Sequence, residues 1–160
     1  MSDTTQSFID RVSTENLTAW LKHLVKDPLP CRTMNYTRPG ASVPTLYEAD
    51  GYIVDTLAVF GYHIEREACQ VQAYRCDESK PIHHQYSAPM ETDPWYTAYN
   101  LYAMRRGSKY PNDLIVVISH KDSQSWVRLG PGAHDNGVGT VANMELARVL
   151  ADYVPQRSIW

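Results

Sequence analysis

A histidine and two aspartates in the last third of this 160-residue sequence are of the types and spacing that could bind a metal ion. His120 and Asp122 follow a short apolar run at residues 114–119, which predicts a strand covered on both faces. Side chains two positions apart leave a strand on the same face, so Asp122 could orient the His120 imidazole, a good zinc ligand when neutral. Asp135 ends the loop that follows this strand, just before a predicted helix.

The spacing of these residues has two explanations. In open α/β sheets, binding sites gather at the edge where strands end, so His120 and Asp135 could meet across a metal, with Asp122 behind the histidine. Alternatively, Asp135 caps the following helix and His120 is a surface residue at a strand end. Short His-x-Asp matches are common by chance, and the spacing alone leaves both explanations open.

Hydrophobic periodicity predicts an α/β domain around these residues. Helices are expected over residues 13–26, 42–60 and 138–153. Strands are expected over residues 62–67, 70–75, 97–105 and 114–119, with the start of another at 157–160. The polar segment 31–42 is expected to be an exposed loop. We predict one domain, residues 1–160, and because it stops on the first residues of a core strand, it looks like a domain cut short.

Three motifs, taken together and in order, resemble the zinc aminopeptidases of peptidase family M28. Those relatives carry a strand ending in H-x-D-S, a loop G-A-x-D-[DN]-x-x-G and a helix with L-E-x-A-R. This sequence has His120-Lys-Asp122-Ser123, then Gly132-Ala-His-Asp135-Asn136-Gly137, then Met144-Glu-Leu-Ala-Arg148. The resemblance also covers the two earlier helices and the strands before Asn100. It implies a three-layer α/β/α sandwich with a mixed central sheet, truncated before the last part of that sheet.

The resemblance implies two zinc ions bridged by a carboxylate and by a water or hydroxide. By position, His120 corresponds to the terminal ligand of one zinc and Asp135 to the bridging carboxylate, while Asp122 corresponds to the partner that orients His120. A cis peptide bond between Asp135 and Asn136 is implied as well. The implied reaction is metal-assisted hydrolysis that releases the N-terminal residue of a peptide substrate. The family also contains carboxypeptidases and cyclases.

The sequence departs from the family pattern at its end. The family's general-base glutamate and its remaining metal ligands would begin near Ile159, and the 160 residues do not contain them. Glu145 cannot replace the base, because it lies about 15 Å along the last helix. We expect the chain alone to bind zinc weakly and not to hydrolyse peptides. The alternative is a non-catalytic binding or assembly module, with homo-oligomers formed through an open sheet edge.

Composition argues against several other classes of protein. Fifteen Lys and Arg against 18 Asp and Glu give a net charge of −3, so no basic surface for nucleic acid is expected. No apolar run approaches the roughly 20 residues that span a membrane, and the N-terminus lacks a secretory signal.

Three cysteines without C-x-x-C spacing favour free thiols and a cytoplasmic location. A Cys69–Cys76 bridge would require their strands to pair. The glycine pairs near residues 130–139 lack the lysine of a phosphate-binding loop.

Overall fold

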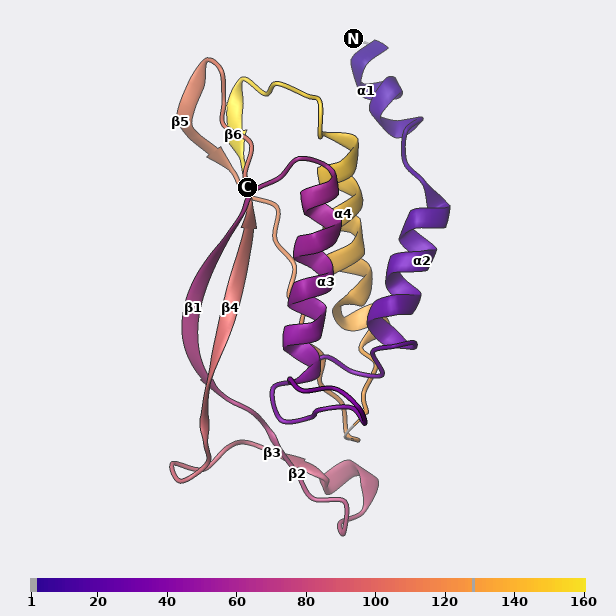
Figure 1. Cartoon of the computed structure of the whole chain (residues 1–160), viewed down its shortest axis with the longest axis vertical. Coiled ribbons are helices and arrows are strands. Elements are labelled where there is room, and N and C mark those ends of the chain that lie inside the picture. Colours follow the sequence, from indigo (N-terminus) through magenta and orange to yellow (C-terminus); the bar gives the residue numbers. More distant parts are fainter. Residues whose placement is uncertain (1–2, 128) are drawn as a thin grey trace.

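The computed structural model of the chain describes residues 3–127 and 129–160. Its helices are α1 (Asp3–Ile9), α2 (Thr14–Val25), α3 (Thr45–Val59) and α4 (Val138–Val149). Its strands are β1 (Ile64–Gln72), β2 (Arg75–Cys76), β3 (Tyr86–Ser87), β4 (Trp95–Ala103), β5 (Tyr110–Ile115) and β6 (Arg157–Ile159). Figure 1 shows that α2, α3 and α4 lie to one side of the long strands β1 and β4.

The three predicted helices form, and local sequence signals explain where they begin and end. The Ser13 hydroxyl accepts a hydrogen bond from the Asn16 N–H at 3.2 Å and caps α2. Helix α3 begins after Pro44, a residue without an N–H to satisfy, and ends just before Gly61, which has a φ of 80°. Helix α4 ends at Val149, four residues earlier than predicted.

The main core lies where α2, α3 and α4 pack together. Its buried members come from all three helices and from the segments after α2 and α3: Trp20, Leu24, Leu29, Ala49, Ile53, Leu57, Tyr62, Val141 and Met144. The Tyr62 hydroxyl donates to the Ala147 carbonyl at 2.9 Å, which joins the end of α3 to α4. This packing fixes α4, whose first turn borders the predicted site.

Residues 62–75 form one long strand followed by a short one, and the predicted division at residues 68–69 is wrong. Strand β1 pairs with β4 in an antiparallel register from Ile64 opposite Ala103 to Gln72 opposite Trp95. The pairing is continuous, because residues 67–70 contain no glycine or proline that would interrupt the ladder. Arg75–Cys76 then pairs with Tyr86–Ser87 in a separate antiparallel sheet.

The apolar run at residues 114–119 is the largest departure from the expected fold. Strand β5 ends at Ile115, and the side chains at 114–118 are exposed, with Ile118 at 87%. The run predicts a strand with covered faces, but among the described residues β5 pairs only with the short parallel strand β6. Two further main-chain bonds continue this contact: the Val117 N–H donates to the Trp160 carbonyl at 2.8 Å, and the Trp160 N–H donates to the Ile115 carbonyl at 2.9 Å.

The α/β class is confirmed, whereas the three-layer sandwich is not seen in the part of the chain that the structure describes. The strands form three two-stranded sheets, β1–β4, β2–β3 and β5–β6, of which only the last is parallel. An antiparallel bridge between Arg105 and Ile159 links the β4 end to β6. The described helices α2 to α4 cover one side of β1 and β4 (Figure 1).

Two further expectations can be compared with the structure. All three cysteines are free, and Cys69 instead donates its thiol hydrogen to the Ala98 carbonyl at 3.5 Å. Within residues 3–127 and 129–160, every helix is too short or too polar to cross a membrane.

Candidate metal site

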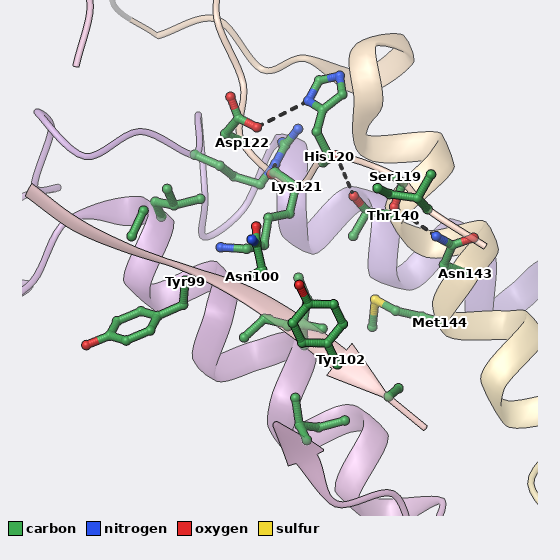
Figure 2. A pocket seen from close by; sticks show the side chains of 18 of the residues that line it. Tyr99, Asn100, Tyr102, Ser119, His120, Lys121, Asp122, Thr140, Asn143 and Met144 are labelled. Atoms are coloured by element: carbon green, nitrogen blue, oxygen red, sulfur yellow. Dashed lines mark hydrogen bonds and ion pairs between the residues drawn. The ribbon is translucent and has the colours of Figure 1, made fainter. Parts of the chain in front are cut away.

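The structure brings together the three residues that the sequence selects as a metal site. The Nε2 atom of His120 lies 2.9 Å from Oδ1 of Asp135, and its Nδ1 atom lies 3.3 Å from Oδ1 of Asp122. The side chains of His120, Asp122 and Asp135 are 51%, 59% and 85% exposed, so the group opens to solvent. Figure 2 shows Asp122 and His120 facing each other at one end of a pocket.

Helix α4 holds the segment that carries His120. The Thr140 hydroxyl donates to the His120 carbonyl at 3.1 Å, and the Asn143 amide donates to the Ser119 hydroxyl at 3.0 Å (Figure 2). Both donors lie in the first two turns of α4, where an inward-facing polar side chain can reach the neighbouring segment. The histidine is therefore anchored through its own main chain.

Asp135 lies in a tight turn, Ala133–Gly137, that leads into α4. The peptide bond between Asp135 and Asn136 is cis, as the family resemblance implies. The Asn136 side-chain oxygen, not that of Asp135, accepts a hydrogen bond from the first turn of α4, from the Gly139 N–H at 3.1 Å. The alternative explanation of Asp135 as the helix cap is therefore wrong, and its carboxylate is directed to His120.

Lys121 also anchors this segment. Its side chain forms an ion pair with Asp50, a buried residue of α3. Burial raises the pKa of the Asp50 carboxyl, although the Lys121 charge acts to lower it. This ion pair was not predicted from the sequence, because Asp50 lies 71 positions before Lys121 and the residues around Lys121 carry no sign of it.

Glu145 is not free to act as a base. Its buried carboxylate accepts the Ser13 N–H at 2.6 Å and two N–H groups of Arg148 at 2.7 and 2.8 Å. Arg148 also donates to the Arg11 carbonyl. The Met144–Arg148 motif therefore joins α4 to the start of α2, and its acidic residue is structural.

A cavity of about 700 Å³ adjoins the site. Its walls come from β1, β4, α3, α4 and the segment 116–124, and Figure 2 shows Tyr99, Tyr102 and Met144 around it. His120 and Asp122 lie on the same wall. This volume falls in the range of small-molecule sites, about 300–1,000 Å³, so a ligand of that size fits beside the two residues.

The residues present fit part of a zinc site. Histidine nitrogen and carboxylate oxygen are zinc donors, and tetrahedral bonds of about 2.0–2.1 Å place two donors roughly 3.3 Å apart, a few tenths more than the 2.9 Å between His120 and Asp135. Asp122 on the other ring nitrogen is the usual support for such a histidine. However, the described residues contain no group of three or more His, Cys, Asp or Glu placed to hold a metal, and catalytic zinc takes three protein ligands.

Sequence comparison finds a family model and several relatives that match part of the chain. Residues 100–160 match the model of Peptidase family M28. A probable zinc metalloprotease of Pyrenophora teres f. teres is 40% identical over 68 residues, 39% of this chain and 14% of that protein. A probable aminopeptidase of Saccharomyces cerevisiae is 40% identical over 58 residues, 34% of this chain and 16% of that protein. An aminopeptidase of Pseudomonas aeruginosa is 42% identical over 62 residues, 38% of this chain and 11% of that protein.

Solved structures resemble a larger part of the chain. An aminopeptidase from Aneurinibacillus sp. strain AM-1 superimposes with a TM-score of 0.69 at 14% identity, over 96% of this chain and 63% of that one. The glutaminyl cyclase of Fimbriiglobus ruber superimposes with a TM-score of 0.63 at 13% identity, over 92% of this chain and 43% of that one. Such low identities show the fold alone, and the chain spans less than two thirds of each of these relatives. The match at residues 100–160 supports the resemblance of this part of the chain to peptidase family M28, and the solved structures show that the chain shares their fold.

Proposed function

We propose that this chain carries part of the zinc centre of an M28-type peptidase, and that the whole protein releases N-terminal residues from peptides. The observation that supports this most directly is that each of the two ring nitrogens of His120 contacts a carboxylate. One ring nitrogen faces a carboxylate that could share a metal, and the other faces a carboxylate that could orient the ring. The names of the relatives, zinc metalloprotease and aminopeptidase, agree with a site of this kind.

Each of the three residues has a distinct role in the proposed centre. Asp122 holds the imidazole proton on Nδ1 of His120, so the Nε2 lone pair is available to the metal. Asp135 presents a carboxylate from a turn that is tied to α4, and it would hold zinc together with His120. Zinc, when bound, supplies an activated water and polarises the scissile carbonyl.

The chain by itself is proposed to lack peptidase activity. Two donors hold a zinc ion less firmly than three, and the described residues contain no group of three donors placed to hold a metal. Hydrolysis also needs a general base near the metal-bound water, and the Glu145 carboxylate is occupied by Ser13 and Arg148. The remaining groups would have to come from other residues of the whole protein.

Thermal unfolding with and without Zn²⁺ tests the proposed centre. A ligand that binds only the folded state raises the melting temperature, so millimolar Zn²⁺ should stabilise the wild-type chain. His120→Ala should abolish the shift, whereas His134→Ala, which removes an exposed histidine from the same turn as Asp135, should preserve it. An equal shift in wild type and His120→Ala would contradict the proposal.

One observation favours a second candidate, a non-catalytic assembly module. The five apolar side chains at residues 114–118 are all exposed, and a run of this kind is unusual on the surface of a monomer. Strand edges with free main-chain groups recruit further strands. We therefore propose that, in this alternative, two copies of the chain associate through this segment.

Sedimentation velocity over a concentration series tests the assembly module. The wild-type chain should form dimers as its concentration rises, and Ile118→Lys should shift it to monomer by placing a charge in the contact. Val59→Lys is the matched control, because Val59 is also apolar and 80% exposed but lies on α3, outside the run. A wild-type chain that stays monomeric throughout the series would contradict this candidate.

A further inference from the structure

Arg32 is a completely buried cation in the connection between α2 and α3. Segment 31–42 was predicted to be an exposed loop, and this is wrong for Cys31, Arg32 and Met34, which are all buried. The ion pairs within 4 Å that involve described residues do not include Arg32; four main-chain carbonyl groups surround its guanidinium instead. Burial lowers the pKa of Arg32, and the Asp122 carboxylate acts in the opposite direction.

The guanidinium contacts both segments that carry the proposed metal ligands. Nε donates to the Lys121 carbonyl at 2.6 Å, Nη1 to the Pro131 carbonyl at 2.7 Å, and Nη2 to the Gly132 carbonyl at 3.0 Å. A fourth bond, from Nη1 to the Leu24 carbonyl at 2.6 Å, ties the group to the end of α2. A rigid planar fork of donors is suited to such a set of carbonyls.

Three of these carbonyls belong to the two segments that carry the site residues. Lys121 stands between His120 and Asp122, so its bond to Arg32 fixes the main chain from which both side chains project. The Gly132 carbonyl also accepts the Gly137 N–H at 2.9 Å and so closes the turn that contains Asp135. One side chain therefore connects the two halves of the site.

The main chain of Arg32 strengthens the same connection. Its N–H donates to the Ser123 hydroxyl at 2.8 Å, and its carbonyl accepts the Ser123 N–H at 2.9 Å. Gly132 allows the close approach on the other side: with a φ of 55°, it would place an added Cβ 2.6 Å from the Asp135 carbonyl oxygen and 3.2 Å from Nη2 of Arg32. The site segments are thus packed directly against the guanidinium.

We propose that Arg32 is a positioning residue whose guanidinium sets the separation between His120 and Asp135. Burying a charge without a carboxylate partner is costly, so a group retained only for stability would be better replaced by an apolar one. The bonds of Arg32 give its charge a role, since they tie the main chain beside His120 to the main chain of the turn that carries Asp135. The effect on zinc affinity rests on the proposed function; the effect on the two segments does not.

Arg32→Lys is the sharpest test, because lysine keeps the positive charge but concentrates its donors on one atom and cannot reach all four carbonyls. Zinc affinity, measured by competition with a chromophoric chelator, should fall roughly 10–100-fold. Arg148→Lys is the matched control: it makes the same change at an arginine near the other end of α4, where the partners are Glu145 and Arg11. It should lower the melting temperature but leave zinc affinity unchanged.

Hydrogen exchange in the metal-free chain separates this proposal from the zinc centre. In Arg32→Lys, peptides covering residues 119–127 and 132–137 should exchange faster, while those of α3 should match wild type. Ser123→Ala removes only the hydroxyl that accepts the Arg32 N–H and should show the same pattern to a smaller degree. It serves as the milder variant if Arg32→Lys does not fold.

The outcomes are distinguishable. If the wild-type chain binds no zinc but the two segments exchange faster in Arg32→Lys, the proposal of a zinc centre is wrong and the positioning role of Arg32 stands. If exchange in the two segments is the same in Arg32→Lys, Arg148→Lys and wild type, Arg32 does not position them and the proposal is overturned. Equal loss of zinc affinity in Arg32→Lys and Arg148→Lys would also overturn it, because the effect would then follow stability alone.

Discussion

The Nε2 atom of His120 lies 2.9 Å from Oδ1 of Asp135, although 15 positions separate the two residues in the sequence. Neither side chain is buried, so packing of the side chains themselves does not hold them there. Contacts behind them do: Thr140 binds the His120 carbonyl, and Arg32 binds main-chain groups on both sides of the pair. The main chain thus places the two proposed ligands together before any metal binds.

Asp122→Asn should weaken zinc binding without removing a proposed ligand. The amide keeps the size of the side chain but loses the charge that orients the His120 ring and increases the basicity of Nε2. Zinc affinity should fall about tenfold in chelator competition, within the range seen for such partners. Asp113→Asn, which removes an exposed charge near Arg157, is the control. Equal affinities in the two variants would show that Asp122 does not act on the histidine.

Gly132→Ala should destabilise the fold, because Gly132 has a left-handed backbone conformation and the atoms around it leave no room for a side chain. The new Cβ would lie 2.6 Å from both the Asp135 carbonyl oxygen and the Ser123 Cβ. We expect a loss of roughly 1–3 kcal/mol in the free energy of unfolding, measured with urea. The control is Gly51→Ala, whose Cβ would meet nothing within 4 Å in the middle of α3 and should stabilise by about 0.5–1 kcal/mol. Similar changes at both positions would contradict the account.

Glu145→Gln should lower stability in a pH-dependent way. Burial alone would raise the pKa of Glu145, but bonds from Arg148 and from the Ser13 N–H outweigh it, and the pKa is lowered from 4.5. A carboxyl whose pKa is lower in the folded than in the unfolded state stabilises the fold at pH values above its unfolded pKa. This stabilisation is lost as the pH falls through the pKa of the folded state. The variant should therefore lose roughly 1–3 kcal/mol near pH 7 and less at an acidic pH, below 4.5, where the wild-type carboxylate begins to be protonated.

Urea unfolding of wild type and Glu145→Gln at both pH values provides the measurement. Glu91→Gln, a change at an exposed glutamate, should alter stability little at either pH. A deficit in Glu145→Gln that is the same at neutral and acidic pH would mean that the carboxylate charge is not what Arg148 and Ser13 stabilise.

The chain alone should not hydrolyse an aminoacyl-anilide. The described residues contain two proposed zinc donors, and Ser13 and Arg148 occupy the Glu145 carboxylate, so a metal-activated water would lack firm binding and would not have Glu145 as its base. Release of the anilide chromophore with added Zn²⁺ should equal the rate of the blank. Turnover that a chelator abolishes, and that Asp135→Ala lacks, would contradict this prediction.

Sequence patterns with local causes predicted the fold well. Ser13, Pro44 and Gly61 act through their own hydrogen bonds or backbone angles, so helix ends could be placed from neighbouring residues alone. The three site residues were found because their spacing matches an ordered set of motifs. His120 and Asp135 come together because the loop between them returns to the end of the strand, an arrangement that is common at binding sites of α/β folds.

Features that depend on distant partners were missed or wrong. Arg32 lies in a polar segment whose composition suggests exposure; its carbonyl partners are up to 100 positions away and carry no side-chain signal. The run 114–118 has the composition of a covered strand, but coverage depends on neighbouring elements, and among the described residues only β6 pairs with β5. Burial of this kind cannot be inferred from the segment itself.

Zinc content measured by mass spectrometry tests the central claim, that His120 and Asp135 form part of a zinc centre. Wild-type chain without a histidine tag and Asp135→Ala would each be dialysed against trace and then against excess zinc. We predict that the wild type retains little zinc from trace concentrations and takes it up from excess, while Asp135→Ala takes up less at both. Two zinc ions per wild-type chain at trace concentration, or equal uptake by the two proteins from excess, would contradict the account.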